Sequence, residues 1–394
     1  MFSFAQNSAM KDLSIYFQPI EFQDKFSEQK IGGNISAYTT ASFPEIKKSG
    51  IALVNVPEFR GANRDSSSIE SEKFRHFLYD LSYGIDWKFP IYDLGNILPG
   101  NELKDTFYAL SNVVAELVKH NVLPIVVGGS QDLTMALYKG YESLEQMVNL
   151  CSVDHQLDLG SPDEEIHADG YLSHLLLQRP CYLFNHANIG LQAPFAEKAA
   201  FDLFEKLYFD VCRLGEFNSD FRKAEPHLRN SDILSVDMKS IRSSELRTQD
   251  YISPNGFYAD QICQITKYAG ISDKLTSVGF FNYYPEKIPS GMSFLLAQMI
   301  WYLMDGFAQR KGDFPAGSKK DYIRFTVNLD DFKDEIVFFK SNKSERWWME
   351  VSYPGNHGSK YDRHHMVPCN KDDYERAMKN EMPDLWWKTY QKLI

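Results

Sequence analysis

The chain has 394 residues, enough for one large domain with additions or for two modest domains. Hydrophobic residues make up 43% and aromatic residues 14%, which supports a sizeable core and excludes global disorder. The formal net charge of -11 and the pI of about 5.4 argue against a surface for nucleic acid or anionic lipid.

No apolar run approaches the roughly 20 residues that a membrane helix needs, so we expect no membrane insertion. The N-terminal stretch lacks the basic start, apolar centre and small-residue cleavage site of a secretion signal, which predicts a cytoplasmic protein. The five cysteines are scattered and form no CxxC motif. They are predicted to be free and mostly buried, without disulfides or structural zinc.

From about residue 49, short apolar runs alternate with longer amphipathic segments. This alternation predicts a parallel sheet covered by helices on both faces, with chemistry at the carboxyl ends of the strands. The expected strands lie within 50–58, 122–130, 147–154, 181–191, 206–214, 232–238 and 275–281, and the expected helices within 64–81, 101–121, 131–144, 258–270 and 290–307.

The pattern changes near residue 313, where a turn-rich connection begins. Three short strands within 323–329, 334–342 and 346–353 are expected to form a small antiparallel sheet. Residues 370–394 predict one or two helices divided near Pro383. We therefore divide the chain into an N-terminal segment (1–48), an α/β domain (49–312) and a C-terminal appendage (313–394) packed on that domain.

Three predicted strand ends carry the chemistry: "VVGGSQDLT", "SVDHQLD" and "LSVDMKSIRSSE". In order and spacing they resemble the GGDHS, DAHxD and SxDxDxxD motifs of the ureohydrolase family, which includes arginase, agmatinase and formimidoylglutamase. Supporting matches such as "VNVPEFRGANRDSSS", "IYDLGNI", "NIGLQ", "RLGE" and "AEPHLRNSDILSVD" point to the formimidoylglutamase branch over roughly residues 50–310. The resemblance implies an arginase-like three-layer α/β/α sandwich with a mostly parallel sheet of about eight strands.

Members of this family hold two manganese ions with four aspartates and two histidines, and the ions generate a hydroxide that attacks an amidine-type carbon. Carried over by position, the resemblance keeps three of the aspartates but replaces the other three ligands. The six positions are Gln131, Asp154, Gln156, Asp158, Asp237 and Lys239.

These replacements argue against a site for two metal ions. Lys239 cannot ligate a cation, and we expect its ammonium group to pair with Asp154 and Asp237 in place of an ion. We therefore expect no cofactor. The alternative is a single hard ion, Mg²⁺ or Ca²⁺ rather than Mn²⁺, held by Asp154, Asp158 and Asp237 with an amide oxygen from Gln131.

The positions on the substrate side of the pattern differ as well. Asn282 occupies the position of the glutamate that holds the amidine group in the family. Ser173 falls on the position of the catalytic histidine, and His174 follows one residue later. His155 is expected to point away from the site because adjacent strand residues face opposite sides, and His364 and His365 are expected in a polar loop.

These substitutions favour a catalytically inactive member of the family with a structural, regulatory or partner-binding role. One alternative is a one-metal hydrolase of formimidoylglutamate or a related amidine, and another is a sensor that binds a polar metabolite in the emptied pocket. A homo-oligomer is possible. Four tryptophans of the appendage either pin it to the main domain or anchor a protein partner, namely Trp347, Trp348, Trp386 and Trp387.

Overall fold

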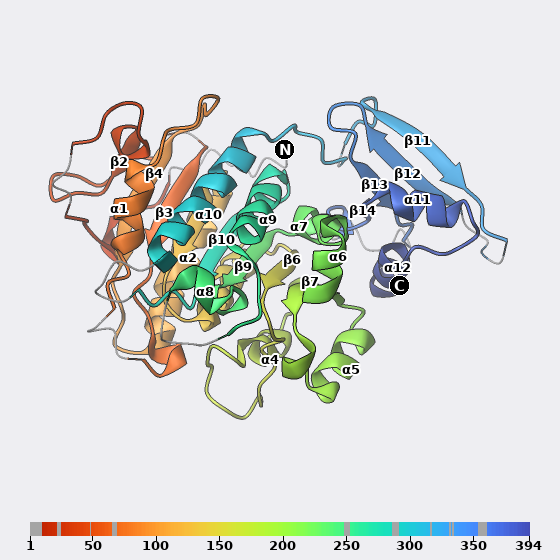
Figure 1. The fold of residues 1–394 in the computed structure, drawn as a ribbon, viewed down its shortest axis with the longest axis horizontal. Coiled ribbons are helices and arrows are strands. Elements are labelled where there is room, and N and C mark those ends of the chain that lie inside the picture. Colours follow the sequence, from red (N-terminus) through yellow and green to blue (C-terminus); the bar gives the residue numbers. More distant parts are fainter. Residues whose placement is uncertain are drawn as a thin grey trace.

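The computed structural model describes residues 10–394 except 22–24, 48, 65–68, 248–252, 286–290, 316, 331, 333–334 and 354–360. Within this part of the chain, a ten-stranded sheet forms the centre of the molecule, and a four-stranded sheet lies at the C-terminal end (Figure 1). No described helix combines the length and the apolar character needed to cross a membrane. The cytoplasmic location stays a prediction.

Eight strands of the central sheet run parallel, in the spatial order β4-β3-β5-β10-β9-β6-β7-β8. The predicted sheet of about eight strands is confirmed. Two short N-terminal strands that the sequence did not indicate, β1 (Phe17–Gln18) and β2 (Ile35–Ala37), pair with β4, β1 in the antiparallel direction. The parallel strands are β3 (Ile51–Asn55), β4 (Ile91–Ile97), β5 (Leu123–Val127), β6 (Val148–Val153), β7 (Leu183–Leu191), β8 (Asp210–Arg213), β9 (Ile233–Asp237) and β10 (Ser277–Phe281).

Helices cover both faces of this sheet, because successive strand residues point to opposite sides. In β3, Ile51 and Leu53 join one apolar core, and Ala52 and Val54 join the other. The first core contains α1 (Lys73–Asp80), α6 (Leu214–Ser219), α7 (Glu225–Asn230), α8 (Ser243–Leu246), α9 (Ala259–Ile271) and α10 (Gly291–Ala308). The second contains α2 (Leu103–Lys119), α3 (Thr134–Glu142), α4 (Tyr171–Leu176) and α5 (Lys198–Lys206).

The C-terminal appendage is an antiparallel sheet followed by two helices. Its fourth strand, which the sequence analysis missed, contains the segment that follows His364 and His365. His364 and His365 do lie in a turn, as expected, but the expected polar character is wrong, because His364 is 2% exposed and its ring stacks on Phe184 of β7 at 4.2 Å. The elements are β11 (Tyr322–Val327), β12 (Ile336–Ser341), β13 (Trp347–Glu350), β14 (Met366–Cys369), α11 (Lys371–Ala377) and α12 (Asp384–Leu393).

The appendage contacts the main domain along α7, β7 and β8, as Figure 1 shows for α7 and β14. Arg229 of α7 donates to the carbonyl oxygens of Trp347 (3.0 Å) and Cys369 (2.9 Å). From α12, the Lys388 ammonium group lies 3.0 Å from Asp210 in β8. These polar contacts surround an apolar cluster that includes residues of both parts.

All five cysteines are free, four of them buried. This confirms the expectation of buried thiols. Burial raises the pKa of the Cys212 and Cys263 thiols to about 12, so both stay protonated at neutral pH.

Candidate functional site

Four neighbouring strands of the central sheet, β5, β10, β9 and β6, deliver polar side chains to one edge. Gln131 begins the turn that follows β5, and Asp237 is the last residue of β9. Asp154 follows β6 directly, and Asn282 follows β10. Because parallel strands end at the same edge, residues up to 151 positions apart in the chain meet there.

The two central carboxylates are buried and bonded to side-chain amides. Gln131 donates from Nε2 to Asp154 Oδ2 at 2.7 Å, and Asn282 donates from Nδ2 to Asp237 Oδ1 at 2.8 Å. The two amides also meet each other, with Asn282 Nδ2 3.4 Å from Gln131 Oε1, and the Tyr284 hydroxyl donates to Asn282 Oδ1 at 2.6 Å. Nitrogen donors therefore occupy oxygen lone pairs that a cation would otherwise use.

The third carboxyl group, on Asp158, adopts its position through a left-handed backbone conformation with φ of 46°. Burial and the nearby Asp154 carboxylate raise the pKa of Asp158 well above its ordinary value. Burial opposes the charge on Asp154 too, but the adjacent His155 imidazole and the Asp158 carboxyl group lower the pKa of Asp154. The two pKa values therefore shift in opposite directions, and a proton bound by the pair favours Asp158 over Asp154.

His155 lies in the site, and the expectation that it would point away from it is wrong. Strand β6 ends at Val153, so the alternation of a strand no longer applies two residues later. The ring nitrogen Nδ1 lies 3.1 Å from Asp154 Oδ1 and 3.8 Å from Asp237 Oδ2, and the ring packs edge-on against Phe195. Burial lowers the pKa of His155, but the two carboxylates more than offset this and raise it.

Lys239 does not form the expected ion pairs with Asp154 and Asp237. Its ammonium group instead contacts the Asp169 carboxylate at 3.1 Å, and among the described residues this is its only ion pair. Gln156 donates to the same Asp169 oxygen at 3.2 Å and to Asp158 Oδ1 at 2.8 Å. Asp169 thus covers the outer side of the network.

Asp169 was not predicted as a site residue, because it matches none of the three motifs and lies 70 residues from Lys239 in the chain. Asp237, by contrast, was identified, but its ionisation could not be read from the motif. Burial and the neighbouring Asp154 charge raise the pKa of Asp237 to about 7, although Lys239 and His155 act in the opposite direction. The site therefore carries less negative charge at neutral pH than its carboxyl groups suggest.

Among the described residues, the side chains of Ser173 and His174 make no hydrogen bond or ion pair with this network. The Ser173 hydroxyl donates to the Gly160 carbonyl at 2.7 Å. His174 lines a separate pocket with Arg60 and His167, and its buried Nε2 has no hydrogen-bond partner among the described residues. The catalytic-histidine position of the family thus supplies no imidazole to the carboxylates here.

A second residue that we missed is Asp132, directly after Gln131. Its carboxyl group is fully buried against the backbone of Gly61, and neither oxygen has a geometrically sound hydrogen bond to a described residue. Burial raises the pKa of Asp132 to about 7, with only a partial offset from Ser130. A signal was present, because a carboxylate stands where the family motif GGDHS has serine.

Three of the four appendage tryptophans, Trp347, Trp348 and Trp386, are at most 9% exposed. Trp348 packs beneath the Arg229 guanidinium, and Trp386 stacks on Tyr390. Buried indoles are unavailable to a partner protein. Only Trp387, at 43% exposed, offers a surface ring among these four.

The donor set fits one cation better than two. At three of the six ligand positions the chain supplies the amides of Gln131 and Gln156 and the ammonium group of Lys239, so a manganese pair does not fit. Ligand atoms of Asp154, His155 and Asp237 lie within 4.8 Å of one another. The buried atoms His155 Nδ1 and Asp237 Oδ2 have no hydrogen-bond partner among the described residues, so both are available as ligands for a single ion.

Comparisons with known proteins agree with this architecture. A model of the arginase family matches residues 49–305. A formimidoylglutamase of Hahella chejuensis is 24% identical over 200 residues, which are 48% of this chain and 60% of that protein. The chain thus matches less than two thirds of the length of this relative.

Solved structures show the same fold at low identity. The formiminoglutamase of Trypanosoma cruzi with manganese matches with a TM-score of 0.62 at 17% identity, over 68% of this chain and 97% of that one. The formimidoylglutamase of Bacillus subtilis also gives 0.62, at 15% identity, over 74% and 96%. The family match covers well over half of the chain, and its neighbours by sequence and structure carry the formimidoylglutamase name. The protein belongs to the arginase family, nearest its formimidoylglutamase members.

Proposed function

We propose that this protein does not hydrolyse amidines with a pair of metal ions and that it serves instead as a regulatory or partner-binding member of the arginase family. The observation that carries the proposal is the pairing of carboxylates with amides. Gln131 occupies Asp154 Oδ2, and Asn282 occupies Asp237 Oδ1. An enzyme that needs these oxygens for metal ions would have to break both hydrogen bonds.

The covering of the site supports the same proposal. The central carboxyl groups of Asp154, Asp158 and Asp237 are at most 5% exposed. Above them, Gln156 bridges Asp158 and Asp169, and Asp169 also holds Lys239. A substrate amidine could reach the carboxylates only after these contacts had opened.

The test combines elemental analysis with a hydrolysis assay. Protein purified without chelator and then incubated with Mn²⁺ should hold no pair of manganese ions, and it should release no formamide from N-formimidoylglutamate above the buffer rate. The matched variant carries Gln131→His, Gln156→His and Lys239→Asp, which rebuild the ligand pattern of the family. It should gain bound manganese. Two ions per wild-type chain, or turnover that chelation abolishes and Mn²⁺ restores, would refute the proposal.

A second candidate is a hydrolase that uses one ion, and the cluster of Asp154, His155 and Asp237 favours it. These three side chains would hold the ion, and His155 takes the place expected of Asp158. An imidazole ligand shifts the preference from Ca²⁺ and Mg²⁺ towards Mn²⁺ or Zn²⁺. A bound ion would supply water of lowered pKa at neutral pH.

The two candidates differ in what His155→Ala does. For a one-ion hydrolase, this variant should lose both the single ion and the turnover, whereas His174→Ala, outside the network, should keep the ion. If the protein is not a hydrolase, the wild type should show no turnover, and His155→Ala should leave the assay unchanged. One ion per chain without turnover would retain the first proposal with a structural ion added.

A further inference from the structure

The opposite edge of the central sheet contains a pocket that has no part in the site described above. Its walls come from the segments that precede β3, β4 and β10, from the start of β5, from the end of α10, and from the appendage. The cavity measures about 460 Å³, within the usual range for small-molecule sites. Its position at the amino ends of the strands separates it from the carboxylates across the full length of the sheet.

Cations dominate this pocket although the whole chain carries a net charge of -11. Four lining residues are basic, and the one acidic lining residue, Asp273, accepts backbone N–H groups of the linker at 2.8 and 3.2 Å. The basic residues are Lys88, Lys274, Arg310 and Arg363. The local charge is therefore the reverse of the overall charge.

Lys274 is 3% exposed, and the carboxylate with which it forms an ion pair, Asp232, is shared with Arg363. Its ammonium group donates to Asn230 Oδ1 at 2.9 Å and to the Arg363 carbonyl at 3.1 Å, which are both neutral oxygens. The Asp232 carboxylate lies 3.9 Å away and is already paired with the Arg363 guanidinium. Burial, reinforced by Arg363, lowers the pKa of Lys274 to about 8.

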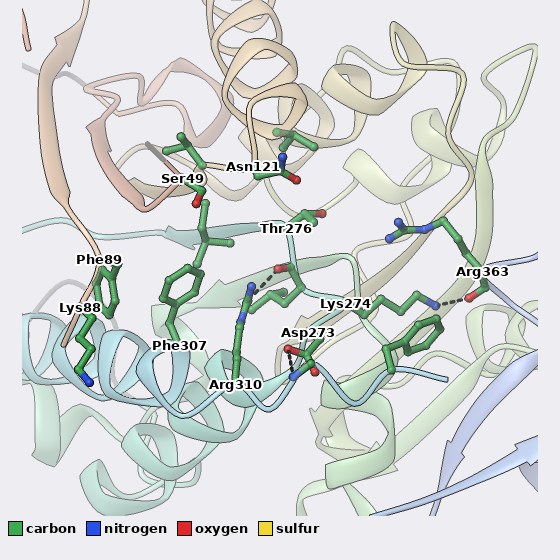
Figure 2. A pocket seen from close by; sticks show the side chains of 16 residues that line it. Ser49, Lys88, Phe89, Asn121, Asp273, Lys274, Thr276, Phe307, Arg310 and Arg363 are labelled. Atoms are coloured by element: carbon green, nitrogen blue, oxygen red, sulfur yellow. Dashed lines mark hydrogen bonds between the residues drawn. The ribbon is translucent and has the colours of Figure 1, made fainter. Parts of the chain in front are cut away.

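Arg310 presents a second cation to the pocket. It extends into the pocket from the end of α10, as Figure 2 shows, and donates to the carbonyl oxygens of Gly270 and Leu275 at 3.0 and 2.9 Å. It forms no ion pair with a carboxylate of the described residues, and burial lowers the pKa of Arg310 to about 10.

The remaining wall is aromatic and aliphatic. Phe307 stacks beneath the Arg310 guanidinium at 4.4 Å, and the Lys274 ammonium group lies 5.8 Å from the Phe314 ring. Phe89 packs edge-on against Phe307 at 4.9 Å. Buried cations beside aromatic rings suit a ligand that combines an anionic group with a flat apolar body.

We propose that this pocket binds a small organic anion, a carboxylate or phosphate attached to an aromatic or similarly flat apolar group. The anion pairs with Lys274 and Arg310, and the apolar part packs against the phenylalanines. Because Gly312 and Phe314 belong to the linker and Arg363 to the appendage, the bound ligand fastens the appendage to the main domain. Ligand occupancy would then regulate the presentation of the appendage, whatever the state of the carboxylate site.

The test is calorimetric titration of the full chain with phenyl phosphate and with phenylacetate at low ionic strength. Inorganic phosphate and benzyl alcohol supply the charge and the apolar part separately. At least one of the two aromatic anions should bind one per chain and at least about tenfold more tightly than either separate part. The aromatic anion that binds identifies whether the site prefers phosphate or carboxylate.

Two variants locate the binding. Arg310→Met should weaken the binding of the aromatic anion at least about tenfold, but this substitution also removes the hydrogen bonds to two backbone carbonyls. Ser49→Tyr fills the pocket from an exposed position without touching a buried charge, and it should weaken binding similarly; Ser219→Tyr on α6 is the matched control. No saturable binding by either aromatic anion, equal binding of inorganic phosphate, or binding unchanged in Ser49→Tyr would overturn the proposal.

Discussion

Asp132 provides a sharp test of the electrostatics at the carboxyl edge. The side chain is 0% exposed, both carboxyl oxygens lack a geometrically sound hydrogen bond to a described residue, and Glu58 and Asp169 add negative charge nearby. Its pKa rises from 3.8 to about 7 because burial penalises the charged form. We predict that Asp132→Asn, which removes the charge and keeps the shape, is more stable than the wild type at pH 8, and that this gain in the free energy of unfolding is smaller at pH 5.

The sign follows from proton binding. The folded protein binds the Asp132 proton more tightly than the unfolded chain does. The contribution of this proton to the stability of the wild type is therefore complete below about pH 4 and is lost as the pH rises towards 7. The shift of about three pKa units corresponds to about 4 kcal/mol at 1.36 kcal/mol per unit. Asparagine does not titrate, so the variant should gain up to about 4 kcal/mol on the wild type between pH 4 and pH 8.

The assay is urea unfolding of wild type and variant from pH 4 to pH 8 in the presence of chelator. The control is Asp202→Asn, at an exposed position of α5, which should change the pH dependence by only a few tenths of a kcal/mol. A stability difference between Asp132→Asn and wild type that stays constant from pH 4 to pH 8 would contradict the reasoning. It would show that the buried carboxyl group is ionised throughout and has a partner.

Arg229→Met should lower the free energy of unfolding by about 3 kcal/mol, because it leaves the Glu225 carboxylate unpaired and two appendage carbonyls without a donor; unchanged urea unfolding would mean that the appendage docks without this residue. Asn282→Ala should cost about 1–3 kcal/mol by the same measurement at pH 8, since Asp237 Oδ1 loses a donor, and a neutral effect would count against the amide–carboxylate network. Ellman's reagent at pH 8 should titrate at most the half-buried Cys181 in the native protein and five thiols after denaturation, and rapid reaction of more thiols would contradict the burial of the other four.

The apolar strands were predictable because burial on both faces leaves continuous runs of hydrophobic residues, as in β5 and β10. Strand β4 is equally buried but was not predicted as a strand, since its sequence carries Asp93 and Asn96. The guanidinium of Arg75 bonds to both, at 2.7 and 2.8 Å, and so allows polar residues inside the sheet. Because these hydrogen bonds join residues that are distant in the sequence, no local sequence pattern indicates that the polar residues of β4 are buried.

The sequence predicted which residues lie in the candidate site better than it predicted which side chains contact one another there. The motifs placed Gln131 and Asp237 at the ends of β5 and β9, which flank β10, because topology alone brings those ends to one edge. Which charges pair depends on side-chain reach and on the backbone after the strand. Asp169 captures Lys239, and the bend after Val153 turns His155 inward, and neither effect follows from motif spacing.

The two edges of the sheet have opposite charge imbalances. At the carboxyl edge, the raised pKa of Asp158 and an Asp237 pKa of about 7 reduce the negative charge of the buried carboxyl groups. At the amino edge, Lys274 shares the Asp232 carboxylate with Arg363, Arg310 has no ion pair among the described residues, and burial lowers the pKa of both lining cations. A soluble anion can relieve the second imbalance reversibly, whereas the first is relieved within the chain. A regulatory ligand is therefore expected at the amino edge, and a change in ligand should leave the carboxylate network in place.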